Sequence, residues 1–149
     1  MLLIGIAVGG YRFYQKWEAR RLVERARTYL SWGDSKSAAL SGRRAFQLDA
    51  RNVDACRVLA EIAEREEQPA AVEWRQQVTV LAPDSAPDVV ALARTALLFN
   101  RIDTADAVLA KLGPTAEQSA EYHEVEAQLA VVKKDPAAAI SDPVQPIVY

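Results

Sequence analysis

The sequence predicts an all-α protein built as a solenoid of antiparallel helix pairs. The first observation is a repeat of small residues, in two interleaved series of alanines. One series has intervals of 34, 33 and 34 residues and consists of Ala26, Ala60, Ala93 and Ala127; the other has intervals of 33, 34 and 34 and consists of Ala38, Ala71, Ala105 and Ala139. A period of this length marks a repeated supersecondary unit, and a small residue on each helix lets two backbones approach closely.

The second observation is the composition. Of the 149 residues, 50% are hydrophobic and 26% are charged, as in a folded protein, and only 6 are glycine. Alanine, leucine, glutamate and arginine are common, and these residues favour helices. The β-branched residues never settle into sustained alternation, so strands are not expected. The length suits one domain.

The N-terminal segment, residues 1–17, is expected to be a membrane anchor. Residues 1–10 carry no charge, and they are followed by interleaved aromatic and basic residues: Tyr11, Arg12, Phe13, Tyr14, Lys16 and Trp17. Such residues are typical of a bilayer interface. Ten helical residues rise only about 15 Å, half of the hydrocarbon core, so the anchor is either marginal or lacks its first residues. A signal peptide and a helix packed on the repeats are the alternatives. We expect a membrane-associated protein with a single-pass anchor, and the side of the membrane stays open.

The first four helices are bounded by turn and capping residues. The first helix is expected to continue from the anchor to about residue 32, where Gly33 can take the left-handed conformation that ends a helix. Asp34 then caps the second helix, and Asn52 caps the third. Pro69 suits the first position of the fourth helix, which ends at the break over residues 82–85. Trp32 and Trp74 lie near helix ends and are expected to pack in the core.

The next three helices follow the same pattern. The fifth is expected to start around Pro87 and to end at Asn100, and Asp103 is expected to cap the sixth. Thr115 with Gln118 is a capping-box signature for the seventh. The apolar side of the seventh helix is expected to consist of Ala120, Tyr122, Val125, Ala127, Leu129, Ala130 and Val131.

The C-terminal end is expected to be incomplete. Asp135-Pro136 begins an eighth helix that Pro143 and Pro146 cut short, and residues 141–149 form an extended tail. A solenoid needs terminal caps with a polar outer face. The sequence therefore predicts exposed apolar surface here and possible self-association through this end. A tail that folds back as a cap or docks on a partner is the alternative.

Two segments resemble a known repeat. Residues 33–40 (GDSKSAAL) and 45–52 (AFQLDARN) look like the second half of a tetratricopeptide repeat, and Leu81-Ala82-Pro83 resembles the ending of that unit. Tyr29 stands where this family favours tyrosine, whereas Leu22 and Ala26 replace its tryptophan and glycine in the first unit. The resemblance covers residues 18–140, as three full repeats and a partial fourth. It implies a right-handed superhelix that binds a protein or peptide on its concave face.

The resemblance also implies which residues line that face, at fixed positions on the first helix of each unit. They are Arg20, Val23, Arg27, Leu30 and Ser31; Asp54, Arg57, Glu61, Glu64 and Arg65; Val90, Arg94, Leu97 and Leu98; and Glu121, Glu124, Gln128, Val131 and Val132. Those expected to contact a partner are Arg27, Arg57, Glu61, Arg94, Leu97, Leu98 and Gln128.

Three of these residues, Arg27, Arg57 and Arg94, could form a discontinuous basic row along the groove. The planar fork of arginine suits a peptide carboxylate or an acidic side chain. The alternative is that these arginines are solvated helix residues that pair with neighbours such as Glu61.

Other functions find little support in the sequence. A net charge of −2 gives no electrostatic reason to expect nucleic-acid binding. Cys56 is the only cysteine, which excludes an intrachain disulfide and a thiolate-rich metal site and favours a buried, inert thiol. His123 is the only histidine, and no serine- or cysteine-centred motif supplies a nucleophile that it could activate as a general base. No phosphate loop or HExxH pair occurs. We therefore expect no enzyme and no cofactor.

The sequence favours a membrane-tethered, non-catalytic scaffold or adaptor that binds a partner protein or peptide. The alternatives are a self-associating structural subunit of a membrane-bound assembly and a regulatory fragment of an enzyme. Substitutions in the groove and at the ends of the repeats would separate the first two.

Overall fold

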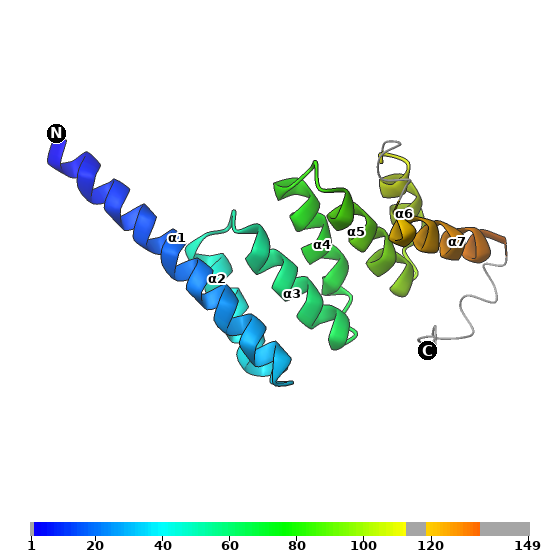
Figure 1. The fold of residues 1–149 in the computed structure, drawn as a ribbon, viewed down its shortest axis with the longest axis horizontal. Helices are drawn as coiled ribbons and strands as arrows, with labels where there is room; N and C mark the ends of the chain where they lie inside the picture. Colours follow the sequence, from blue (N-terminus) through cyan, green and yellow to red (C-terminus); the bar gives the residue numbers. More distant parts are fainter. Residues whose placement is uncertain (1, 113–118, 135–149) are drawn as a thin grey trace. The chain divides into compact units, whose positions relative to one another are not determined.

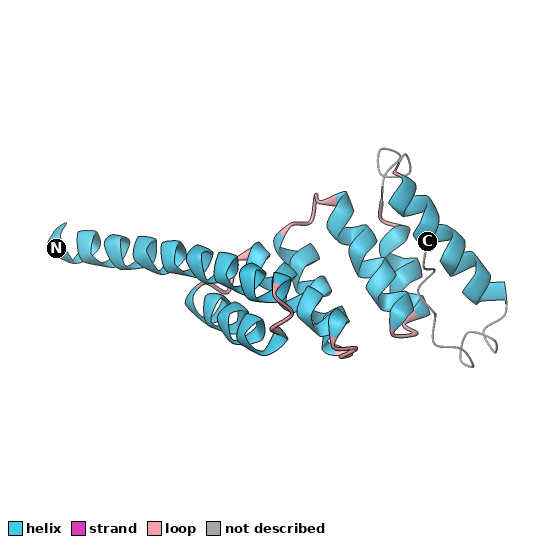
Figure 2. Cartoon of the chain, turned by 60° about the horizontal axis from the view of Figure 1, so that its bottom comes forward, coloured by secondary structure: helices cyan, strands magenta, loops and turns pink. Residues whose placement is uncertain are grey.

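The computed structural model describes residues 2–112 and 119–134, with side chains from residue 10 onward. This part of the chain folds into seven α-helices and no strand, which confirms the all-α prediction (Figures 1 and 2). The helices are α1 (Leu2–Ser31), α2 (Ser35–Leu48), α3 (Val53–Arg65), α4 (Ala70–Leu81), α5 (Ala86–Leu98), α6 (Ile102–Leu109) and α7 (Ala120–Lys134). The chain divides into two compact units, Met1–Leu81 and Ala82–Tyr149.

Unit 1 is a set of helices that each reverse the direction of the one before (Figure 2). Helix α1 packs on α2 and α3, and α3 also packs on α2 and α4. The core uses only the C-terminal half of α1, through Ala19, Val23, Ala26 and Leu30. Ala38 and Ala45 of α2 and Ala55, Val58 and Ile62 of α3 complete this cluster. Trp74 of α4 meets Phe46 of α2 edge-on, with ring centroids 5.1 Å apart.

Unit 2 contains α5, α6 and α7. Helix α7 packs on both α5 and α6. The core cluster consists of Val90, Ala93, Ala96, Ala105, Leu109, Tyr122, Val125 and Leu129. Helix α6 is only 8 residues long, and the partly buried Val108 and Leu112 extend its apolar side.

The same type of turn follows α1, α3 and α5, and successive turns are separated by 34 and 33 residues, the period of the alanines. The residues with positive φ are Gly33 at 79°, Glu67 at 52° and Asn100 at 55°. The backbone N–H of the residue that follows each one donates to the carbonyl five residues earlier: Asp34 to Tyr29 at 2.9 Å, Gln68 to Ala63 at 2.8 Å, and Arg101 to Ala96 at 2.7 Å. This is the Schellman geometry that satisfies the last carbonyls of a helix. The backbone thus repeats the same connection three times.

Side chains cap the helices that follow these turns and loops, mostly as expected. The Asp34 carboxylate accepts from the Ser37 N–H at 3.0 Å, and Asn52 Oδ1 accepts from the Ala55 N–H at 3.0 Å. The hydrogen bonds from Ser37 lower the pKa of Asp34. The expected cap Asp103 is wrong, because the N-cap of α6 is Arg101, two residues earlier, and Asp103 lies in the first turn.

Six of the eight repeated alanines are fully buried, three in α1, α3 and α5 and three in α2, α4 and α6. The prediction that small residues stand at close helix contacts is confirmed for these six. Ala127 is exposed, because α7 buries the opposite side, through Tyr122, Val125 and Leu129. The expected apolar side of α7 is therefore wrong at Ala120, Ala127, Ala130 and Val131, all of which are exposed.

Several expectations fall outside the described residues. These are Ala139, the capping box of Thr115 and Gln118, the start of an eighth helix at Asp135-Pro136, and the tail over residues 141–149. Stacking of all the pairs into one right-handed superhelix stays a prediction.

The expected single-pass membrane anchor is wrong. None of the helices in the described residues combines the length and the apolar character needed to cross a bilayer. Helix α1 runs unbroken from Leu2 to Ser31 through the expected boundary at residue 17, but its charge-free stretch ends at Arg12. Over residues 12–21 the helix then contains four basic residues: Arg12, Lys16, Arg20 and Arg21. Helix α1 is therefore long enough to cross a bilayer, but its apolar part is too short to do so.

Two large side chains differ from the expected core. Trp32 is 73% exposed and only meets the Tyr29 ring edge-on, at 5.9 Å. It lies in the turn after α1, which ends at Ser31. The expectation of a core role is therefore wrong for Trp32, whereas Trp74 does pack against another helix.

Candidate functional site

The first helices of unit 1, α1 and α3, are joined at the surface by an ion-pair cluster. The Asp54 carboxylate at the start of α3 accepts from Arg27 of α1 at 3.1 Å and from Arg57, one turn later in α3, at 3.1 Å. Arg27 also donates to Glu24 at 2.8 Å. The side chains of Arg27 and Arg57 are 46% and 37% exposed, so the cluster is at the protein surface. We call this surface the α1–α3 face.

A second contact holds the other end of the α1–α3 face together. Arg65, in the last turn of α3, donates to the backbone carbonyl of Leu30 at 3.1 Å and to the Glu61 carboxylate at 2.8 Å. The Leu30 carbonyl belongs to the C-terminal turn of α1, where a cation is favoured by the helix dipole. Glu61 is thus paired with Arg65. These bonds fix the spacing of α1 and α3 at both ends of the face.

Unit 2 has a corresponding surface on α5 and α7. Arg94 of α5 lies 4.0 Å from the carboxylate of Glu124 on α7. Leu98, at the end of α5, is 59% exposed, whereas Leu97 is partly buried against the unit 2 core. Gln128 is exposed on α7. This surface is less charged than the α1–α3 face.

The structure brings some predicted residues together and removes others from the surface. Arg27 and Arg57 meet at one carboxylate, and Arg94 belongs to the other unit, so the basic row across units stays a prediction. Val23, Leu30 and Val90, expected to line the groove, are instead buried, with at most 4% exposure. They belong to the cores because their positions on α1 and α5 face neighbouring helices.

Sequence reasoning missed Glu24, which is three residues before Arg27, a spacing that predicts a helical ion pair. Arg65 was expected on the groove and is exposed, but the sequence did not predict its hydrogen bond to a backbone carbonyl 35 residues away.

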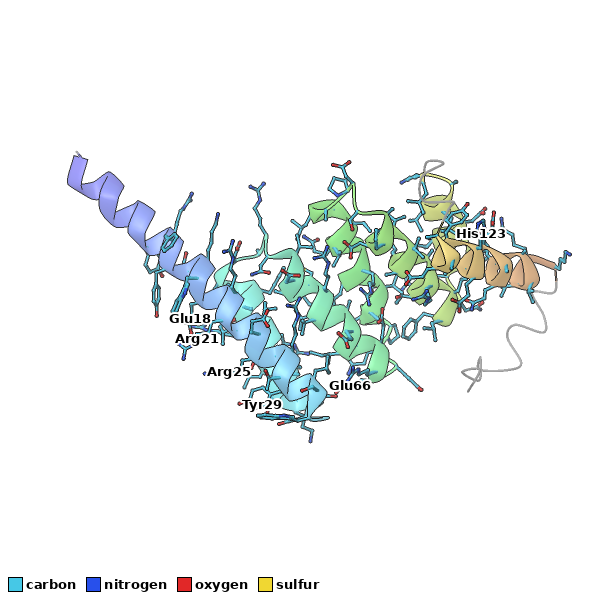
Figure 3. The ribbon with its side chains drawn as sticks, in the orientation of Figure 1. Glu18, Arg21, Arg25, Tyr29, Glu66 and His123 are labelled. Atoms are coloured by element: carbon cyan, nitrogen blue, oxygen red, sulfur yellow. The ribbon has the colours of Figure 1, made fainter. Side chains whose placement is uncertain are left out.

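Cys56 and His123, the single cysteine and the single histidine, belong to different units. Cys56 is fully buried, and burial raises the pKa of its thiol to about 11, so it is protonated and inert at neutral pH. His123 stands exposed on α7, with Nδ1 3.6 Å from the Glu126 carboxylate (Figure 3). Among the described residues, no group of three or more His, Cys, Asp or Glu side chains could hold a metal ion.

One open pocket of about 510 Å³ lies in unit 2, between the start of α6 and the end of α7. Its lining combines apolar side chains with charged ones of both signs, and consists of Asn100, Arg101, Ile102, Asp103, Thr104, Val132 and Lys133. Lys133 is bound to Asp106 at 2.6 Å. Apart from Val132, the pocket contains none of the residues expected to face a partner.

No protein-family model matches the chain, and no curated protein matches it significantly. The resemblance to tetratricopeptide repeats therefore stays a prediction from the residues quoted above.

Proposed function

We propose that the protein is a non-catalytic interaction module, a scaffold or adaptor that binds a partner protein or peptide on its first-helix faces. The observation that carries this proposal is the cluster of Arg27, Asp54 and Arg57 at the surface of α1 and α3. Two guanidinium groups from different helices are held in place before any partner arrives.

Preorganisation makes these arginines suited to recognition. Ordering a long side chain on binding costs about 0.5–1.5 kcal/mol, and a side chain already held by Asp54 avoids part of that cost. A guanidinium presents five donors in a fixed fork, and the side chains of Arg27 and Arg57 stay more than one third exposed, so a partner's carboxylate can reach them and share or displace the carboxylates already bound. The partner favoured by this chemistry carries acidic side chains or a terminal carboxylate.

The surface of unit 2 supplies apolar contact in the same proposal. Arg94 and Gln128 offer polar donors, and Leu98 offers an exposed apolar side chain next to the half-buried Leu97.

The test begins with proteins retained by the immobilised full chain, followed by calorimetric titration of each one. Arg27→Ala with Arg57→Ala should weaken binding at least tenfold, or about 1.4 kcal/mol. Arg57→Ala with Arg94→Ala should do the same if both units contact the partner. Arg43→Ala with Arg44→Ala is the matched control, because it removes two exposed arginines from α2, outside the α1–α3 face.

The control should change the affinity less than twofold. A partner that binds the Arg27/Arg57 double variant with unchanged affinity, while the circular-dichroism spectra of both proteins agree, would contradict the proposal.

A further inference from the structure

The N-terminal part of α1 carries an aromatic surface outside the α1–α3 face. Tyr11, Phe13, Tyr14 and Trp17 are all more than half exposed, and Phe13 reaches 74%. From residue 10 onward, where side chains are described, the first fully buried residue of α1 is Ala19. Figure 1 shows α1 continuing past the end of α2 on this side of unit 1. We call residues 10–21 the α1 arm.

The aromatic side chains of the α1 arm are arranged on one side of the helix. Phe13 and Tyr14 precede Trp17 by four and three residues, and the Tyr14 and Trp17 rings lie 6.3 Å apart. The Arg21 guanidinium covers the Trp17 ring at 5.8 Å. At about 3.6 residues per turn, Trp17 is opposite Ala19 and Ala26, which face the core. The aromatic side is therefore turned away from unit 1's own packing.

The charge of the arm limits what can cover it. Residues 10–21 contain four basic residues and one acidic residue, a net charge of +3. Glu18, the acidic one, already lies 3.7 Å from Arg21. Two such arms would repel each other. A partner surface must instead be acidic and must have room for large rings.

The outer side of α7 has both properties. Ala120, Ala127 and Val131 follow one another at helical spacing on the side opposite to Tyr122, Val125 and Leu129, and all three are exposed, Val131 by 68%. The exposed Glu124 and Glu126 flank this row, and each also lies near a side chain of its own unit, Arg94 at 4.0 Å and His123 at 3.6 Å. Ala127 is also the one exposed member of its alanine series. Residues 82–149 as a whole contain ten acidic and five basic residues.

We infer that the α1 arm of one copy docks on the outer side of α7 of a second copy. Small side chains on α7 leave space for Phe13 and Trp17, as small residues do at close helix contacts elsewhere in this chain. Arg20 and Lys16 approach Glu124 and Glu126, and this charge complementarity sets the pairing of arm with α7. The contact is heterologous, because each copy contributes its arm to one contact and its α7 to another, so the assembly either closes into a ring or extends as an open chain.

The test is the mass of the full chain by sedimentation velocity between about 1 and 200 µM. The mass should rise with concentration above that of the monomer, and association should weaken about tenfold as salt screens the charges between 50 and 500 mM. Phe13→Ala with Trp17→Ala should weaken association at least tenfold, and so should Ala127→Arg. These positions are exposed, so the circular-dichroism spectrum should not change.

Matched controls use the same substitutions elsewhere. Trp32→Ala removes another exposed tryptophan from outside the arm, and Ala107→Arg adds an arginine at an exposed alanine of α6. Both should associate like the unmodified chain.

A mixture of the two kinds of variant distinguishes the contact between the arm and α7 from a symmetric contact between two identical surfaces. The arm variant retains α7, and Ala127→Arg retains the arm, so an equimolar mixture should form a heterodimer that does not grow further. A mixture that remains monomeric, an unmodified chain that is monomeric at all concentrations, or arm variants that associate normally would each overturn the inference.

Discussion

At the scale of single residues, the turn after α3 holds a strained position. Glu67 has φ of 52°, where the equivalent turn after α1 has Gly33. A left-handed conformation costs a non-glycine residue roughly 1–2 kcal/mol, and glycine's extra freedom in the unfolded chain offsets about half of that. Glu67→Gly should therefore raise the free energy of unfolding by about 0.5 kcal/mol. Urea denaturation measures it. Glu66→Gly, at an ordinary φ of −93°, should lower it, so equal signs for the two variants would contradict this account.

A second residue-scale prediction concerns a close contact between α2 and α3. A Cβ added to Gly42 would lie 3.1 Å from Leu59 Cδ2 and 3.3 Å from Leu59 Cγ. Gly42→Leu should therefore destabilise the protein by about 1–3 kcal/mol, the usual cost of overpacking. The same substitution at Gly10, which has no atom within 4 Å of its Cβ position, should not lower the thermal midpoint. Equal effects at both sites would show that α2 and α3 are not in close contact there.

At the scale of helices, α4 is tied to α3 by a bidentate ion pair. Arg75 donates to both Glu64 oxygens, at 2.7 and 2.9 Å, and the two side chains are 15% and 22% exposed. Arg75→Ala should cost about 2 kcal/mol, because it leaves a partly buried carboxylate without its main partner. Arg75→Lys should retain only part of this stability, since lysine cannot form the fork. Thermal unfolding compares them with Arg43→Ala, an exposed arginine of α2 that should change stability by less than about 0.5 kcal/mol.

Helices were easier to predict from the sequence than surfaces. Gly33, Asp34 and Asn52 act through neighbours within six residues, so their capping roles can be derived locally. The six buried alanines can be located because their spacing is itself the signal. The Arg65–Leu30 bond joins residues far apart in the chain. The side of α7 that is buried depends on which helices surround it, so the repeat alone placed Ala127 wrongly.

At the scale of the whole molecule, each of the two units has its own core cluster. Unfolding of the two units can be followed separately by fluorescence and circular dichroism. All three tryptophans precede residue 82, so their fluorescence reports on unit 1, whereas circular dichroism reports on every helix. Leu129 of α7 packs in the unit 2 cluster. Leu129→Ala should destabilise unit 2 by about 2–4 kcal/mol and lower the urea midpoint by circular dichroism, with little change in the tryptophan midpoint.

The matching variant in unit 1 is Val58→Ala, which should shift the tryptophan midpoint instead, because Val58 lies in the other cluster. If Leu129→Ala moves both signals equally, the two units unfold as one cooperative block and their separate cores do not act independently.

The buried thiol is an intrinsic probe of local unfolding in unit 1. Cys56 is the only cysteine and is sealed inside unit 1 as a protonated group. A maleimide or disulfide reagent can reach it only while α3 is transiently detached from its neighbours. The labelling rate of the unaltered protein, without any engineered probe, therefore measures how often unit 1 opens locally around α3.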